Sequence, residues 1–246
     1  MSAKKKVALV TGAAGSMGLA TAKGLIEDGY AVVMGDVDSA KLRKLAAPLG
    51  AGAYPLAFDV SKYEQVESAI RRAEGEVGPI DVLVNNAGIL SNNKVAETTP
   101  DEWHKVLSVN LDGAFYLSKL LLPGMKARRW GRIVNTCSYA MKSGGVTAGT
   151  AYTVSKGALQ ALTFSLAREC TAFGVTVNGI APAHVRTPMV TEQLTKEQQD
   201  KMIAMIPVGR FCEPEEFAHC VRFFVSPLAG FITGEILDMN GGLHMD

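Results

Sequence analysis

Short apolar runs alternate with longer stretches of helix-forming sequence along the first half of the chain, and this alternation constrains the fold more than any other feature. The apolar runs lie at 7–10, 31–34, 54–58 and 80–84. Continuous apolar runs of this length are typical of strands that are buried on both faces. Strands that alternate with helices form parallel sheets, and right-handed crossovers place the helices on both faces. The sequence therefore predicts an α/β fold with a doubly wound parallel sheet.

The same alternation continues in the second half of the chain. Further strands are predicted at 132–136, 175–180 and 236–239, which brings the sheet to about seven strands. No internal repeat, low-complexity tract or linker interrupts the pattern, so we expect residues 1–246 to form a single domain. The segment 188–205 is polar and lacks a strand pattern, and it is interpreted as a lid over the substrate site.

Composition and charge argue against several classes of function. The net charge is +1, so neither nucleic acid nor an anionic membrane is expected as a partner. No apolar run approaches the roughly 20 residues that span a bilayer, and none resembles the core of a signal peptide. The four cysteines are scattered, which indicates reduced thiols in a cytoplasmic protein. The dispersed histidines predict no metal site.

A glycine-rich turn, TGAAGSMG at 11–18, lies between the first predicted strand and the first predicted helix. Glycines allow a backbone to approach phosphate groups closely, and the start of a helix offers free N–H groups with a positive dipole end. The turn therefore favours a dinucleotide, although its spacing is not GxGxxG and such a turn alone leaves other functions open.

Asp36 ends the second predicted strand, where a carboxylate can accept hydrogen bonds from ribose hydroxyls. Its negative charge would also repel a 2′-phosphate. Between Thr11 and Asp36 the only basic residue is Lys23, which lies inside a predicted helix. NAD is therefore favoured over NADP as the cofactor. The alternative is that Asp36 is an ordinary turn carboxylate.

Tyr152 and Lys156 are four residues apart in a predicted helix, so their side chains share one face. A positive charge beside a phenol favours the phenolate form, and such a pair can exchange a proton with an alcohol or carbonyl oxygen. Taken alone, the pair also fits a solvated helix face.

Several pieces of the sequence occur together in an order that resembles the short-chain dehydrogenase/reductase family, and the resemblance covers essentially the whole chain. The pieces are TGAAGSMG (11–18), Asp59-Val60, NNAG (85–88), Asn110, Ser138, the Tyr152 and Lys156 pair, APAHVRT (181–187) and GEILDMNGG (234–242). The resemblance implies a Rossmann-like fold in which a hydride passes between NAD and a small-molecule secondary alcohol or ketone.

The resemblance also implies roles for individual residues. Tyr152 would be the general acid/base, Lys156 would stabilise its phenolate and bind the nicotinamide ribose, Ser138 would hold the substrate oxygen, and Asn110 would organise a proton-relay water. A homotetramer is implied as well, built partly on the helix at 151–173 and the C-terminal segment. The expected cofactor contacts are Gly12, Gly15, Ser16, Met17, Gly18, Asp36, Asp59, Val60, Asn86, Ala87, Gly88, Tyr152, Lys156, Pro182, Val185 and Thr187.

Three departures from the family pattern are visible. Ser16 stands where the family usually has its second glycine, although Gly15 can supply the backbone freedom. Ala183 replaces a glycine, which would matter if a positive φ were needed there. Ser138 and Tyr152 are 14 residues apart, one more than the usual gap, and we place the extra residue in the loop 143–149.

The substrate remains open at this point. Two alternatives to an alcohol dehydrogenase are a 3-oxoacyl-thioester reductase of the fatty-acid type, which would use NADPH, and a catalytically idle NAD-binding regulator. His184 could face the substrate or pack, Lys142 could contact an acidic substrate or be solvated, and Cys137 is expected to point into the sheet. The expected pocket residues are Leu90, Ser91, Tyr139, Met141, Val146, His184 and Met189.

Overall fold

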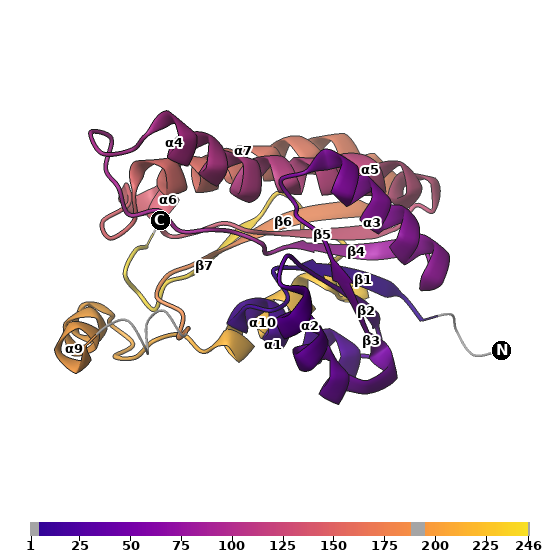
Figure 1. Cartoon of the computed structure of the whole chain (residues 1–246), viewed down its shortest axis with the longest axis horizontal. Helices are drawn as coiled ribbons and strands as arrows, with labels where there is room; N and C mark the ends of the chain where they lie inside the picture. Colours follow the sequence, from indigo (N-terminus) through magenta and orange to yellow (C-terminus); the bar gives the residue numbers. More distant parts are fainter. Residues whose placement is uncertain (1–4, 188–194, 246) are drawn as a thin grey trace.

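The centre of the computed structural model, which describes residues 5–187 and 195–245, is a seven-stranded sheet (Figure 1). Every neighbouring pair of strands is parallel, in the order β3-β2-β1-β4-β5-β6-β7. The strands are β1 (Val7–Thr11), β2 (Ala31–Asp36), β3 (Ala53–Ala57), β4 (Ile80–Asn85), β5 (Gly131–Thr136), β6 (Val175–Pro182) and β7 (Ile236–Met239). The predicted doubly wound parallel sheet is therefore confirmed.

Helices cover both faces of this sheet, as Figure 1 shows. On one face lie α3 (Tyr63–Glu76), α4 (Pro100–Leu107), α5 (Gly113–Ala127) and α7 (Thr150–Cys170). On the other face lie α1 (Ser16–Glu27), α2 (Ser39–Ala46) and α10 (Pro214–Val225). Each side has its own apolar core against the sheet, because the central strands are buried on both faces.

Two helical regions are irregular. The helix that begins at Ser39 ends at Ala46 and continues as a 3-10 turn (Ala47–Gly52), because Pro48 has no N–H to donate into an α-helix. The long helical region that begins at Pro100 is interrupted by a π-helical turn (Ser108–Asp112).

Two further helices are α6 (Ala140–Ser143), which was not predicted from the sequence, and α9 (Lys196–Met205). Short 3-10 turns lie at Thr171–Phe173 and Pro227–Ala229. In Figure 1, α9 lies apart from the helices that cover the sheet. In the described part of the chain, no helix is both long and apolar enough to cross a membrane.

The strand order places a crevice at the carboxyl ends of β1 and β4. The chain builds outward from β1 through β2 to β3, and in the opposite direction from β4 through β5 to β7. Ligands of open α/β sheets bind where the strand order reverses in this way. The glycine-rich turn after β1 and the NNAG stretch after β4 both open into this crevice.

Candidate active site

The turn that joins β1 to α1 has a backbone that only glycine allows at key positions. Gly12 has φ +64°, and a Cβ on Gly18 would lie 2.2 Å from the carbonyl oxygen of Gly12. The amide nitrogen of Ala14 donates to Asp36 Oδ2 at 2.9 Å, and Asn86 Nδ2 donates to the carbonyl oxygen of Thr11 at 2.9 Å. The turn is thus fastened to the ends of both neighbouring strands.

A cavity of about 640 Å³ lies along this turn and brings together most of the expected cofactor contacts. Those on its wall are Gly12, Gly15, Ser16, Met17, Gly18, Asp36, Asn86, Gly88, Tyr152, Lys156, Pro182 and Thr187. Four expected contacts lie elsewhere. Asp59 caps its own turn by accepting from Ser61, Val60 and Ala87 line a small cavity behind the sheet end, and Val185 faces a second large cavity.

The residues along this cavity fit a nicotinamide dinucleotide. The glycines leave the space that side chains would otherwise fill, and α1 begins at Ser16 on the cavity wall. Asn86 Oδ1 is a buried acceptor without a hydrogen-bond partner among the described residues. A bound polar group would satisfy it, because buried polar atoms are normally paired.

Lys41 also lines the cavity, and the sequence analysis missed it. Lys41 belongs to the first turn of α2 and so lies beyond the stretch from Thr11 to Asp36, where Lys23 is the only basic residue. Asp38 caps that helix by accepting from the Lys41 amide at 3.0 Å, so the α2 start is fixed beside Asp36. An anionic and a cationic side chain therefore both line this cavity.

Ser138, Tyr152 and Lys156 meet where β5 ends and α7 begins. The Ser138 side chain is buried, and its Oγ accepts from the amide of Ala140 at 3.1 Å, which leaves its O–H free to donate. Lys156 Nζ donates to the carbonyl oxygen of Thr136 at 2.6 Å and lies 5.7 Å from the centre of the Tyr152 ring. The helical spacing of Tyr152 and Lys156 is therefore confirmed.

Asn110 lies in the π-helical turn between α4 and α5 and is almost fully buried. Its Oδ1 accepts from the amide of Ile89 at 2.8 Å, and its Nδ2 donates to the Ile89 carbonyl and to Ser155 Oγ, each at 3.0 Å. Turns of this kind are frequent at functional sites. The side chain thus joins the segment after β4 to α7, next to Lys156.

A second cavity of about 390 Å³ adjoins the first, and Tyr152 borders both. Of the expected pocket residues, Leu90, Tyr139, Val146 and His184 lie on its wall, beside Ser138. Ser91 is instead buried and bonded to Glu102, and Met141 packs in a small apolar core. Met189 lies outside the described residues. The second cavity is the candidate substrate site.

The contacts of three nearby residues bear on what was expected of them. Lys142 forms an ion pair with Asp238 at 2.6 Å, so it is neither solvated nor an evident substrate contact. Cys137 is buried as expected, and this burial raises the pKa of its thiol to about 11. His184 faces the substrate cavity and packs its ring edge against Phe211, and burial lowers its pKa.

Two of the departures from the family pattern cause no backbone strain. Among the described residues other than glycine, only Arg129 has a positive φ, so Ala183 stands where no glycine is required. Ser16 is the first residue of α1, and Gly15 before it has an extended backbone. The expected place of the extra residue between Ser138 and Tyr152, the loop 143–149, follows directly after α6, and this placement stays a prediction.

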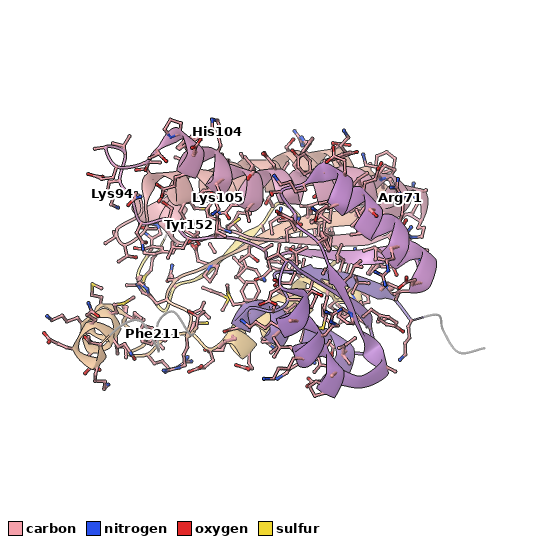
Figure 2. All side chains as sticks on the ribbon, viewed as in Figure 1. Arg71, Lys94, His104, Lys105, Tyr152 and Phe211 are labelled. Atoms are coloured by element: carbon pink, nitrogen blue, oxygen red, sulfur yellow. The ribbon has the colours of Figure 1, made fainter. Side chains whose placement is uncertain are left out.

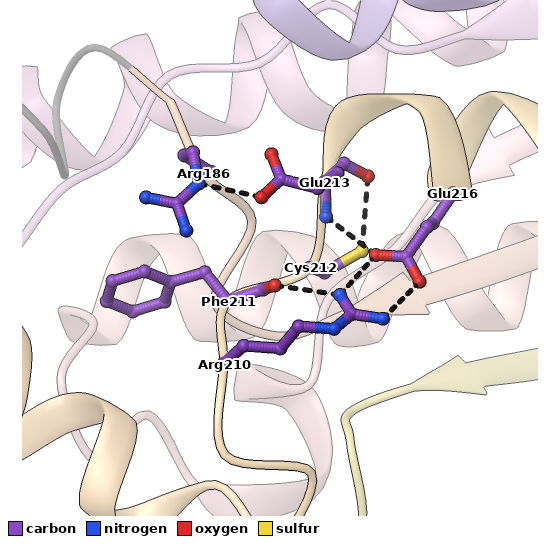
Figure 3. A network of polar contacts seen from close by, with 6 residues as sticks. All are labelled: Arg186, Arg210, Phe211, Cys212, Glu213 and Glu216. Carbon is purple, nitrogen blue, oxygen red and sulfur yellow. Dashed lines mark hydrogen bonds and ion pairs between the residues drawn. The ribbon is translucent and has the colours of Figure 1, made fainter.

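An ion-pair network holds the segment after β6, and it was not predicted from the sequence (Figure 3). Arg186 pairs with Glu213 at 2.8 Å, and Arg210 binds Glu216 with both terminal nitrogens, at 2.6 and 2.8 Å. Hydrogen bonds from Arg210 and from the Glu213 amide lower the pKa of Glu216 to about 2. Phe211, labelled in Figure 2, is fully buried between these pairs. The network thereby ties the segment after β6, which carries His184, to the segment that leads into α10.

The predicted lid is described only in part. Residues 188–194 lie outside the described part of the chain. The helical portion, α9, is capped by Thr195, and its last residue, Met205, lies on the wall of the substrate cavity. A lid over the substrate remains a prediction for this segment.

Comparisons with known proteins agree with this geometry. The family described as enoyl-(acyl carrier protein) reductase matches residues 12–244. The 3-oxoacyl-[acyl-carrier-protein] reductase FabG of Vibrio harveyi is 38% identical over 246 residues, which is all of both chains. The acetoacetyl-CoA reductase of Shinella zoogloeoides is 40% identical over 240 residues, covering 96% of this chain and 98% of its own. Both relatives carry names of reductases that act on 3-oxoacyl thioesters.

Proposed function

The chain belongs to the short-chain dehydrogenase/reductase family, and we propose that it reduces the ketone of a 3-oxoacyl thioester to the 3-hydroxyacyl thioester. The observation that carries the proposal is the position of Tyr152 on the wall shared by the cofactor and substrate cavities. Relatives with end-to-end similarity are named for this substrate class. The proposal narrows the broader expectation of a secondary alcohol or ketone and gives more weight to the thioester alternative.

The chain's own residues supply the proton and the alignment for this step. The Tyr152 hydroxyl donates its proton to the ketone oxygen, and the Lys156 ammonium stabilises the phenolate that remains. The free Ser138 O–H donates to the same oxygen and orients the carbonyl. A nicotinamide cofactor held in the first cavity would supply the hydride for the carbonyl carbon and would itself be oxidised. One C=O bond thus becomes a CH–OH group, with the hydride from the cofactor and the proton from Tyr152.

The direct test is a substrate panel with NADH and with NADPH, in which the reduced nicotinamide is followed. We expect kcat/KM for acetoacetyl-CoA to exceed that for simple ketones and cyclic ketones by about 10²-fold, because the site holds the rest of the thioester as well. A higher value for simple ketones would favour a general alcohol dehydrogenase instead. Cofactor binding without turnover of any substrate would favour an NAD-binding regulator.

For the cofactor we propose NADH. This choice differs from the NADPH that is expected for a 3-oxoacyl-thioester reductase of the fatty-acid type. Asp36 supports this choice, because its carboxylate ends β2 on the cavity wall and its Oδ2 accepts from Ala14. A 2′-phosphate placed at this end would meet that negative charge, and Lys41 would offset it only in part. A preference of the unaltered protein for NADPH would contradict this proposal.

Asp36→Asn is expected to move the cofactor preference toward NADPH. The change keeps the shape of the side chain and an acceptor for Ala14, but it removes the charge. Removing a repulsion of a few kcal/mol at close range should raise the ratio of kcat/KM for NADPH to that for NADH by about 10- to 100-fold. Asp101→Asn, at the exposed start of α4, is the control and should leave the ratio unchanged.

We also propose the homotetramer that the family resemblance implies. Large side chains are exposed on α5 and α7, namely Phe115, Phe164 and Val154. Apolar side chains gathered on one helical face are typical of subunit contacts. The molar mass of the protein in solution, measured by light scattering, tests the proposal.

A further inference from the structure

The loop between α6 and α7 forms part of the substrate cavity wall. Gly145, Val146, Thr147 and Ala148 all lie on that wall. Gly144 and Gly145 have φ of +72° and +75°, a conformation that leaves this stretch few intrinsic restraints. Its shape must therefore be set by contacts from outside the loop.

The segment that follows β4 supplies those contacts. The carbonyl oxygen of Ser91 accepts from the Gly149 amide at 2.6 Å, and that of Asn93 accepts from the Thr150 amide at 3.0 Å. Lys94 Nζ donates to the carbonyl oxygens of Gly145 and Ala148 at 2.5 and 2.7 Å. Lys94 and Tyr152 lie at the same end of the molecule in Figure 2. Backbone hydrogen bonds thus hold the C-terminal end of the loop, and the ammonium group of Lys94 holds its middle.

The backbone at Gly149 packs so closely against the segment 91–93 that no side chain fits between them. A Cβ there would lie 2.5 Å from the carbonyl oxygen of Asn93 and 2.7 Å from that of Ser91. The two segments therefore approach each other as closely as their backbones allow. This approach places the Lys94 side chain within reach of the loop carbonyls.

The segment that carries Lys94 is itself anchored at two points. Ser91 Oγ and Asn93 Nδ2 donate to the carboxylate of Glu102 on α4, and these bonds lower the pKa of Glu102. Upstream, the peptide groups of Ile89 are held by Asn110. The backbone that carries Lys94 is therefore held by Asn110 and by Glu102. The Lys94 ammonium in turn binds the loop that forms the substrate cavity wall.

We propose that Lys94 is a positioning residue that holds the 145–148 wall of the substrate cavity, and so sets the affinity for the part of the substrate beyond the reacting carbonyl. A lysine carries three donors and no acceptor, which suits it to bridging two carbonyls. Hydrogen bonds that involve a charged group are about twice as strong as neutral ones. The claim about substrate affinity rests on the proposed thioester reduction, whereas the claim about the loop does not.

The test compares Lys94→Met with two matched variants. Lys94→Arg keeps a cation with several donors and should retain the bridge. Lys105→Met removes an exposed lysine from the surface of neighbouring α4 and serves as the control (Figure 2). All four proteins are compared by thermal unfolding, by amide hydrogen exchange of the peptides that cover 143–150, and by KM and kcat for acetoacetyl-CoA and for a small ketone.

For Lys94→Met we expect exchange in this loop to rise about 10-fold and KM for the thioester to rise about 10-fold, the change that a lost charge-assisted bond of about 1.5 kcal/mol produces. The kcat should stay within about threefold, and KM for the small ketone should change little, because neither Tyr152 nor the carbonyl site moves. Lys94→Arg should restore both values.

Each other outcome overturns a stated part of the proposal. Unchanged exchange would show that Lys94 does not hold the loop, whatever the substrate. Faster exchange with unchanged KM for the thioester would refute the role in affinity. If the unaltered protein fails to reduce any 3-oxoacyl thioester, the proposed function is wrong, but the exchange measurement still decides the role of Lys94. If Lys94→Met does not fold, the same measurements are made on Lys94→Gln. Unchanged amide hydrogen exchange of the loop in Lys94→Gln would also contradict the proposal.

Discussion

Tyr152→Phe is expected to lower kcat by about 10²- to 10⁴-fold, the range that a positioned general acid contributes. The variant removes one oxygen atom and keeps the ring that borders both cavities. Without the hydroxyl, the ketone oxygen loses its proton donor, while Lys156 stays bonded to Thr136. Single-turnover reduction of acetoacetyl-CoA measures the chemical step directly.

Binding separates this result from a loss of folding. The dissociation constant for NADH should stay within about threefold of the value for the unaltered protein, because the phenol oxygen contributes one contact among many. Tyr54→Phe, on the exposed edge strand β3, makes the same chemical change away from the site and should keep full activity. A Tyr152→Phe protein with full turnover would refute the assignment of the general acid.

Gly18→Ala is expected to damage both the cofactor cavity and the fold around it. The new Cβ would lie 2.2 Å from the carbonyl oxygen of Gly12 and 2.8 Å from Cα of Ala13, and both are backbone atoms that cannot rotate away. The turn must shift, so we expect the dissociation constant for NADH to rise at least about 10-fold. Overpacking of this kind costs about 1–3 kcal/mol, which lowers Tm by several degrees in a chain of this length.

Gly75→Ala is the matched control for that experiment. Gly75 belongs to α3, and a Cβ there would have no atom within 4 Å. The same substitution at this position should stabilise the protein by about 0.5–1 kcal/mol, because alanine favours a helix over glycine. Calorimetry and a cofactor titration on both variants check the pair. Equal cofactor affinity in Gly18→Ala and in the unaltered protein would contradict the role of this turn.

The elements that were predicted well share a local origin. The apolar runs that form β1, β2 and β4 are continuous in sequence, and the Tyr152 and Lys156 pair is one helical turn apart. Such patterns involve residues within a few positions of one another, so they can be recognised without knowledge of the rest of the chain. The π-helical turn that carries Asn110 was missed, because one extra residue in a helical turn leaves no periodic pattern.

The sequence by itself determined the doubly wound sheet and the glycine-rich turn after β1, whereas the residues proposed to bind the cofactor and transfer the proton were inferred from the family resemblance. Only the tertiary structure decided that Lys94 reaches the carbonyls of Gly145 and Ala148, 51 and 54 residues away, and that Lys142 pairs with Asp238, 96 residues away. It also placed Lys41 beside Asp36 on the cofactor cavity. The physical reason is that strand and helix patterns depend on neighbouring residues, whereas these contacts depend on strand order and on how closely loops from different strands approach at one end of the sheet.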